Sequence, residues 1–274
     1  METKTITING LEIHYSDNEN TSKRSLLFIH GNSLSGGLFH AQFNDAELNQ
    51  YRLVAPDLPG HGASAKSENP EKDYGVLSFI DMLQQLVKEL SLKHIVLVGH
   101  SLGGHIAIHL MKALQNNGVI IDGIALMGTP PLTMPPRMDQ AFFANPAMGL
   151  AFKGELSDDE ITMLASAFTH QKDALDSVKQ QIQQSDPMVR PMIGQSIATQ
   201  LTEDEVEILK STKAPIAVLH GRKDELVNDS YIKNQRIEIW ENKIHYIPDA
   251  GHCAFLENPG ELNAKLVEFV NVGE

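Results

Sequence analysis

A Gly-x-Ser-x-Gly pattern at residues 99–103, set between an apolar strand and a helix, constrains the fold of this chain more than any other feature. The preceding residues 94–98 are apolar and rich in β-branched side chains, which is typical of a buried parallel strand. The following residues 104–111 predict a helix. A serine at such a junction sits in a sharp, strained turn that lifts its hydroxyl above the sheet, and the glycines leave room for that turn. The pattern therefore predicts that Ser101 is a nucleophile.

Strands and helices alternate along the first half of the chain. Residues 3–8 and 11–15 alternate apolar and polar side chains around Asn9 and Gly10, which predicts an antiparallel hairpin. Four apolar, strand-like segments follow, at residues 25–30, 51–55, 94–98 and 120–127. Helical patterns separate them, as at residues 75–90 and 102–116. This alternation predicts an α/β fold with a mostly parallel, doubly wound sheet of about eight strands and helices on both faces.

The alternation stops after the sixth predicted strand. Between residues 130 and 209 the chain has helical patches, prolines and polar connectors but no convincing strand. Strand patterns resume at residues 214–220 and 244–247, and a helical pattern over 259–270 closes the chain.

We therefore expect three segments: a first part of the core over residues 1–132, a helical lid over 133–209, and a second part of the core over 210–274. The region of the lid is rich in methionine and phenylalanine. Methionine-rich surfaces adapt to irregular apolar ligands, although most of these side chains are expected to pack the lid against the core.

A serine nucleophile needs a general base, and the base needs a carboxylate that orients it. On this architecture the order along the chain is serine, acid, histidine. The strand pattern at residues 214–220 leads into a loop that contains Asp224, which we predict to be the acid, with its neighbour Glu225 as the alternative. His252 follows the last strand pattern and is the predicted base.

The same chemistry needs two backbone N–H donors for the oxyanion that forms during acyl transfer. Leu102, directly after the nucleophile, is expected to supply one. The other is expected from the loop after the strand at residues 25–30, where the N–H of Asn32 is the candidate. The side chains of Asn32 and Ser33 are expected either to bind substrate or to stabilise the loop.

The charge balance of the chain argues against nucleic-acid binding. Acidic residues outnumber basic ones by 35 to 22, and the formal net charge is −13. The acidic side chains are scattered or lie on predicted helices, as at residues 203–207, a distribution that favours solubility. A nucleic-acid footprint needs a basic face, so no nucleic-acid partner is predicted.

Neither a membrane span nor secretion is predicted. No apolar run reaches membrane-spanning length, and residues 1–5 lack the apolar core of a signal peptide. Cys253 is the single cysteine, which excludes an intramolecular disulfide and suits a reducing compartment. We expect a cytoplasmic protein in which Cys253 is a small buried side chain, with a reactive thiol as the alternative.

Two histidines have a spacing that suits a metal. His105 and His109 lie four residues apart on a predicted helix, but they lack the glutamate of the His-Glu-x-x-His pattern and a third ligand. No metal site is predicted.

Together these residues resemble the α/β-hydrolase superfamily over nearly the whole chain outside the lid. The matching stretches are residues 30–31, 57–62, 99–103, 221–224 and 251–252. The resemblance implies an α/β-hydrolase fold, a catalytic triad at Ser101, Asp224 and His252, and no cofactor. Residues 30–33, 101–106, 128–131 and 239–241 look like those of the α/β-hydrolase type of N-acyl-homoserine lactonase. Those lactonases carry a glutamate at the place of Asp224.

We predict a small-molecule hydrolase that cleaves carboxylic esters or lactones through an acyl-enzyme, with N-acyl-homoserine lactones as one candidate substrate. One alternative keeps the triad for another reaction, as a C–C bond hydrolase or a cofactor-free haloperoxidase-like enzyme. Another is a ligand-sensing protein on the same fold. A complete triad with an oxyanion hole favours an enzyme, which the fold alone would not do. The sequence leaves the oligomeric state open.

Overall fold

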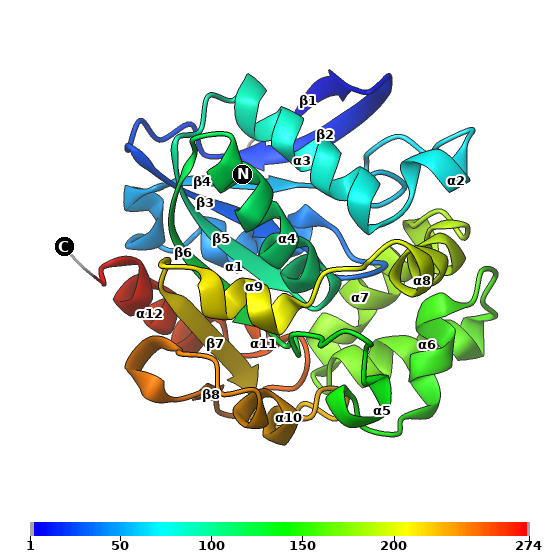
Figure 1. The fold of residues 1–274 in the computed structure, drawn as a ribbon. Coiled ribbons are helices and arrows are strands. Elements are labelled where there is room, and N and C mark those ends of the chain that lie inside the picture. Colours follow the sequence, from blue (N-terminus) through cyan, green and yellow to red (C-terminus); the bar gives the residue numbers. More distant parts are fainter. Residues whose placement is uncertain (1–2, 273–274) are drawn as a thin grey trace.

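One sheet organises the computed structural model, which describes residues 3–272. Its eight strands within these residues are β1 (Thr3–Ile8), β2 (Leu11–Asp17), β3 (Arg24–Ile29), β4 (Arg52–Pro56), β5 (His94–His100), β6 (Ile120–Met127), β7 (Ile216–Gly221) and β8 (His245–Ile247). They lie in the order β1-β2-β4-β3-β5-β6-β7-β8 (Figure 1). The first two pairings in this order are antiparallel and all the others are parallel. The predicted hairpin and the mostly parallel α/β sheet are confirmed.

Helices cover both faces of the sheet. One face carries α3 (Val76–Glu89) and α4 (Leu102–Asn116), and the other carries α1 (His40–Phe43), α11 (Ala254–Glu257) and α12 (Pro259–Val270). Successive residues of β3 alternate between the two cores, because successive side chains of a strand point to opposite faces. Leu27 and Ile29 pack with α3 and α4, while Leu26 and Phe28 pack with α1, α11 and α12.

The helices form where the sequence supplies a continuous apolar stripe. In α3 the buried residues recur at helical spacing, at Val76, Phe79, Ile80, Leu83, Leu86 and Val87. In α4 most residues from Leu102 to Leu114 are buried, because this helix lies between the sheet and two other helices, α3 and α9. Shorter elements lie in the connections between these strands and helices: α2 (Pro70–Asp73), α10 (Asp229–Asn234), η1 (Gly36–Phe39), η2 (Leu48–Gln50) and η4 (Trp240–Asn242).

The segment between β6 and β7 is helical. It contains α5 (Met138–Ala141), η3 (Pro146–Phe152), α6 (Asp158–Phe168), α7 (Lys172–Gln184), α8 (Val189–Thr199) and α9 (Glu205–Ser211). A capping box begins α6, where Ser157 and Glu160 satisfy each other's backbone N–H groups. Helices α5 to α8 gather at one side of the molecule, whereas α9 packs on α4 (Figure 1). The division into core and lid at residues 133 and 209 stays a prediction.

None of the helices within residues 3–272 combines the length and the apolar character needed to cross a bilayer.

Gly103 lies where α4 passes over the end of β3. A Cβ at this position would lie 2.1 Å from the carbonyl oxygen of Ile29, far inside normal contact distance. We expect Gly103→Ala to lower the free energy of unfolding by about 1–3 kcal/mol, measured by urea denaturation. Gly260 on α12 is the matched control, because nothing lies within 4 Å of its Cβ position. Gly260→Ala is expected to change the free energy by less than about 1 kcal/mol, and equal losses in both variants would contradict the close-packing argument.

Candidate active site

Ser101 lies in a strained turn between the end of β5 and the start of α4. Its φ is 51° and its ψ is −118°, in a region that residues with side chains rarely occupy. Its backbone N–H donates to the carbonyl of Met127 at 2.9 Å, which ties the turn to the neighbouring strand β6. A Cβ on Gly99 would lie 2.5 Å from the carbonyl oxygen of Gly103, so the turn closes only with glycine there. The geometry is the sharp strand-to-helix turn that the sequence predicts.

The structure brings Asp224 and His252 together from two strands. Asp224 follows β7 and His252 follows β8, and Oδ2 of Asp224 lies 2.9 Å from Nδ1 of His252. Both side chains are almost fully buried. Glu225, the alternative acid, is exposed. The acid that faces the predicted base is therefore Asp224.

Asp224 is an ionised carboxylate in a buried place. Burial alone would raise its pKa. The charge and hydrogen bond of His252 lower the pKa by more than burial raises it, to about 2. Its Oδ1 accepts the backbone N–H groups of Leu226 at 2.8 Å and Val227 at 3.1 Å. With Asp224 on Nδ1, the Nε2 of His252 is the ring nitrogen that remains for another partner.

Ser101 and His252 line the same pocket. Its other lining residues are Asn32, Leu102, His105, Leu132, Met138, Phe142, Met148, Ala151, Phe152, Phe168, Ile193, Ile197 and Leu226. Most of these are apolar and come from the helical segment between β6 and β7. The pocket has a volume of about 70 Å³, which is roughly the space of a few water molecules. A mainly apolar lining with a few polar groups is typical of a small-molecule site.

The two candidate oxyanion donors also line this pocket. Leu102 is the first residue of α4, where backbone N–H groups have no partner within the helix. Within residues 3–272, the backbone N–H groups of Leu102 and Asn32 have no hydrogen-bond acceptor. The side chain of Asn32 donates to the carbonyl of Ala151 at 2.7 Å and lies 3.1 Å from the hydroxyl of Ser33. These contacts stabilise the loop, which is one of the two roles expected for these side chains.

A buried arginine joins this loop to the helices above it. Arg190 on α8 is 3% exposed. Its guanidinium donates to Ser33 Oγ at 3.4 Å, to Ser185 Oγ at 3.0 Å and to the carbonyl of Lys153 at 2.7 Å, and it also bonds the carbonyl of Gly154. Sequence reasoning missed Arg190, because nothing in its local sequence distinguishes it from a surface arginine.

A second carboxylate–histidine cluster borders the pocket. Nδ1 of His105 lies 2.8 Å from Oε2 of Glu205, and Nε2 of His109 lies 3.3 Å from Oε1. Burial alone would raise the pKa of Glu205, but the two histidines lower it to about 2. Glu205 lies in the acidic stretch at residues 203–207, yet it is 1% exposed. Its helix packs on α4, and no local signal in the sequence predicts that contact.

Residues 3–272 contain no group of three or more histidine, cysteine or acidic side chains arranged to hold a metal ion. Cys253 is fully buried, and burial raises the pKa of its thiol well above the ordinary value. This matches the small buried side chain that was expected, since the thiolate is the reactive form.

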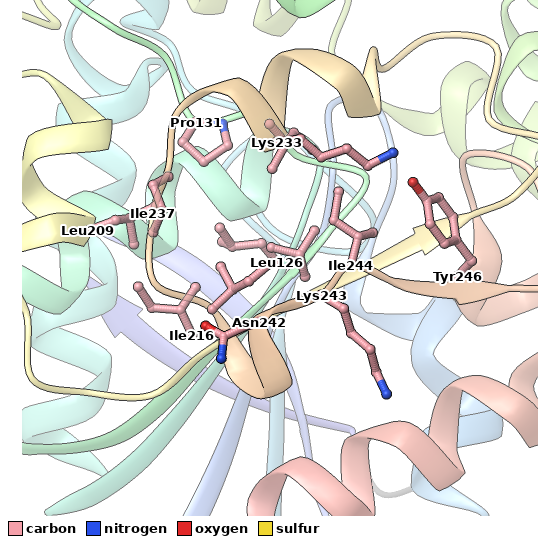
Figure 2. Close-up of a pocket in the computed structure, with 13 residues that line it drawn as sticks. Leu126, Pro131, Leu209, Ile216, Lys233, Ile237, Asn242, Lys243, Ile244 and Tyr246 are labelled. Carbon is pink, nitrogen blue, oxygen red and sulfur yellow. The ribbon is translucent and has the colours of Figure 1, made fainter.

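A wider pocket of about 430 Å³ lies away from Ser101, between β6, β7 and β8 and the segment that joins the last two strands (Figure 2). Isoleucine side chains dominate it, and Lys233 and Lys243 lie at its edge. Both lysines already form ion pairs, with Asp229 at 2.8 Å and Glu241 at 2.7 Å. None of the candidate site residues lines this pocket.

Comparison with known proteins gives one family. The model of the alpha/beta hydrolase family matches residues 26–265. A solved structure of the N-acyl homoserine lactonase AidH, complexed with N-butanoyl homoserine, is 28% identical. It has a TM-score of 0.91, and the match covers 98% of this chain and 96% of the other.

Two further matches cover nearly the whole chain. The non-heme chloroperoxidase of Burkholderia pyrrocinia is 27% identical over 96% of this chain and 98% of its own. A structure of a putative aryl esterase from Burkholderia cenocepacia shares the fold, with 22% identity, a TM-score of 0.80 and 98% of each chain covered.

Proposed function

This chain belongs to the alpha/beta hydrolase family, and we propose that it is a serine hydrolase which cleaves small carboxylic esters or lactones through an acyl-enzyme. The arrangement of three residues carries the proposal. Ser101 sits on the strained turn, and the buried Asp224–His252 pair, 2.9 Å apart, lines the same pocket. Nucleophile, base and orienting acid are the groups that this chemistry needs.

In the proposed mechanism, Nε2 of His252 takes the proton of the Ser101 hydroxyl while Oγ of Ser101 attacks the carbonyl carbon of the substrate. The backbone N–H groups of Asn32 and Leu102 bind the oxyanion of the tetrahedral intermediate. The intermediate collapses, the bond to the leaving oxygen breaks, and His252 returns the proton to that oxygen. His252 then removes a proton from a water molecule as the water oxygen attacks the acyl carbon. The bond to Ser101 Oγ breaks, His252 gives the proton to that oxygen, and the carboxylic acid leaves.

Asp224 acts on His252 throughout this cycle. It holds the proton of His252 on Nδ1, so that Nε2 is free to accept, and it stabilises the imidazolium that forms. A pKa of about 2 keeps the Asp224 carboxylate ionised at neutral pH.

Lactonase and esterase relatives favour ester-bond chemistry for this pocket. N-acyl-homoserine lactones are one candidate substrate class, since AidH is an N-acyl homoserine lactonase at 28% identity. The chloroperoxidase relative supports a haloperoxidase-like reaction as the second candidate. A screen of 4-nitrophenyl esters and acyl-homoserine lactones, beside a halogenation assay with peroxide, separates these candidates.

We expect Ser101→Ala to lower kcat for ester hydrolysis by about four orders of magnitude or more, because no other group forms the acyl-enzyme. The unfolding midpoint of the variant serves as the control for folding. A serine-directed phosphonate is expected to add once per chain, at Ser101, as read by mass spectrometry of peptides. Turnover near the wild-type rate in the variant would exclude the serine mechanism.

The acid is tested by a matched pair of neighbouring variants. We expect Asp224→Asn to lower kcat by a few orders of magnitude, because the amide holds the wrong tautomer of His252 and cannot stabilise its charged form. Glu225→Gln, at an exposed position, is expected to cost little. The reverse pattern would assign the role to Glu225.

The apolar lining predicts how activity depends on acyl length. Each buried methylene strengthens binding by up to about 0.8 kcal/mol until the pocket is full. We expect kcat/KM for 4-nitrophenyl esters to rise from acetyl to acyl groups a few carbons longer and to fall once the chain outgrows the pocket of about 70 Å³. A steady decline from acetyl onward would show a pocket too small for acyl chains and would remove the support for long-chain acyl-homoserine lactones.

A further inference from the structure

We infer that Glu257 is a positioning residue for the proposed base His252, and that it acts by joining the backbone before His252 to residues 168–170, where α6 ends. The inference rests on the proposed function, because it concerns the proton transfers that the proposed mechanism assigns to His252. Glu257 does not line the pocket of Ser101. Its effect on the reaction is therefore expected to pass through His252.

The side chain of Glu257 is buried between two segments of the chain. Glu257 is the last residue of α11 and is 6% exposed. Its Oε2 accepts the backbone N–H of Gly251, the residue before His252, at 2.6 Å. Its Oε1 accepts the hydroxyl of Thr169 at 2.9 Å and the backbone N–H of His170 at 2.8 Å. Within residues 3–272 these three groups are the hydrogen-bond partners of the carboxylate.

A carboxylate suits this place because both of the segments that it joins offer hydrogen-bond donors. Each of its two oxygens accepts, so one oxygen binds Gly251 while the other binds residues 168–170. The amide of a glutamine has one accepting oxygen and one donating nitrogen. Glu257→Gln therefore keeps the size of the side chain but sets N–H against N–H on one of its two sides. Leaving a buried donor without an acceptor is unfavourable, so we expect the two segments to move apart there.

Residues 168–170 also hold the backbone after His252. The N–H of Cys253 donates to the carbonyl of Phe168 at 2.9 Å. The residues on either side of His252 are therefore both tied to the end of α6, Cys253 directly and the other one through the carboxylate of Glu257.

The end of α6 contacts the loop of the acid and the pocket as well. Nε2 of His170 lies 3.3 Å from the carbonyl oxygen of Lys223, the residue before Asp224. The ring of Phe168 lines the pocket and lies 5.7 Å from the ring of His252, measured between ring centres. Residues 168–170 thus contact the loops of both the acid and the base.

The position of the His252 backbone determines where Nε2 lies. Asp224 fixes the direction of the ring through Nδ1, but the ring moves with the Cα to which it is attached. In the proposed mechanism, Nε2 has to reach first the hydroxyl of Ser101 and then the leaving oxygen of the substrate. A displacement of about 1 Å at such a site can lower a rate by a factor of about 100. Weakening the contacts of Glu257 is therefore expected to slow the proton transfers.

Protonation of the leaving oxygen gives a readout that is specific to His252. The 4-nitrophenolate ion leaves without a proton, whereas an alkoxide is too basic to leave before it is protonated. A displaced His252 therefore slows the hydrolysis of alkyl esters more than that of 4-nitrophenyl esters. A loss of folded protein lowers the activity toward all esters by the same factor.

The test measures kcat/KM for four butanoate esters, whose leaving alcohols are 4-nitrophenol, phenol, trifluoroethanol and ethanol in order of decreasing acidity. This parameter covers the steps up to release of the alcohol, so it does not depend on hydrolysis of the acyl-enzyme that all four share. For each ester, the value of the variant is divided by that of the wild type. We expect Glu257→Gln to lower this quotient about tenfold more for the ethyl ester than for the 4-nitrophenyl ester, with the other two between them.

Glu261→Gln is the matched control. Glu261 lies in the first turn of α12, and within residues 3–272 its carboxylate forms no hydrogen bond. The substitution removes the same charge from the chain four residues further on but breaks no contact to residues 168–170. We therefore expect one quotient, close to that of the wild type, for all four esters.

Thr169→Val tests whether Glu257 acts through the end of α6. It removes the hydroxyl that donates to Oε1 and keeps the N–H bonds of His170 and Gly251. We expect a smaller selective loss for the ethyl ester than in Glu257→Gln. In the double variant, Thr169→Val is expected to add less than it does alone, because both changes act on one set of contacts. If Glu257→Gln does not fold, the selective loss in Thr169→Val decides the question by itself.

Three results would overturn the inference: equal quotients for all four esters in Glu257→Gln, an equal selective loss in Glu261→Gln, or full additivity in the double variant. If Ser101→Ala abolishes hydrolysis in these cases, the proposed function stands and only the role of Glu257 falls. If the wild type hydrolyses none of the four esters, or if Ser101→Ala hydrolyses them as fast as the wild type, the proposed function fails and the inference fails with it.

Discussion

The close approach of α4 to the sheet is the constraint on which the site depends. Ser101 has a positive φ of 51°, so the chain reverses within one residue and the helix begins directly above the strand ends. Gly103 permits this, because any side chain there would meet the carbonyl of Ile29. With the helix at this distance, Ser101, Leu102 and His105 all line one pocket.

Two buried carboxylates then orient two histidines beside this pocket. Asp224 arrives at the end of β7 and Glu205 at the start of α9, so the two pairs come from different layers of the fold. Each carboxylate accepts a hydrogen bond from a backbone N–H group in addition to its contact with the histidine. These bonds offset the cost of burying the charge. The surrounding side chains are mostly apolar, and electrostatic interactions are stronger in such a place than in water. A few polar groups in fixed directions therefore dominate what the pocket can bind.

How far the sequence predicts this site depends on whether the determining contacts are local. The turn at Ser101 is encoded by adjacent residues, so the motif alone indicates it. The choice between Asp224 and Glu225 is not local, because it depends on which side chain the end of β7 aims at His252 across two strands.

Glu205 shows more clearly where prediction from the local sequence fails. It lies in an acidic stretch that has the composition of a solvated helix, and only the packing of α9 on α4 buries it. The order of strands and helices follows from periodic patterns that span many residues, which is why the fold was the more predictable part.

Arg190 and Asn32 connect the helices above the pocket to the loop that carries a candidate oxyanion donor. Asn32 bonds the carbonyl of Ala151 in η3, and Arg190 on α8 reaches Ser33. These bonds make the position of the loop depend on the position of η3 and α8. The candidate oxyanion donor is therefore placed by helices that lie far from it in the sequence as well as by its own strand.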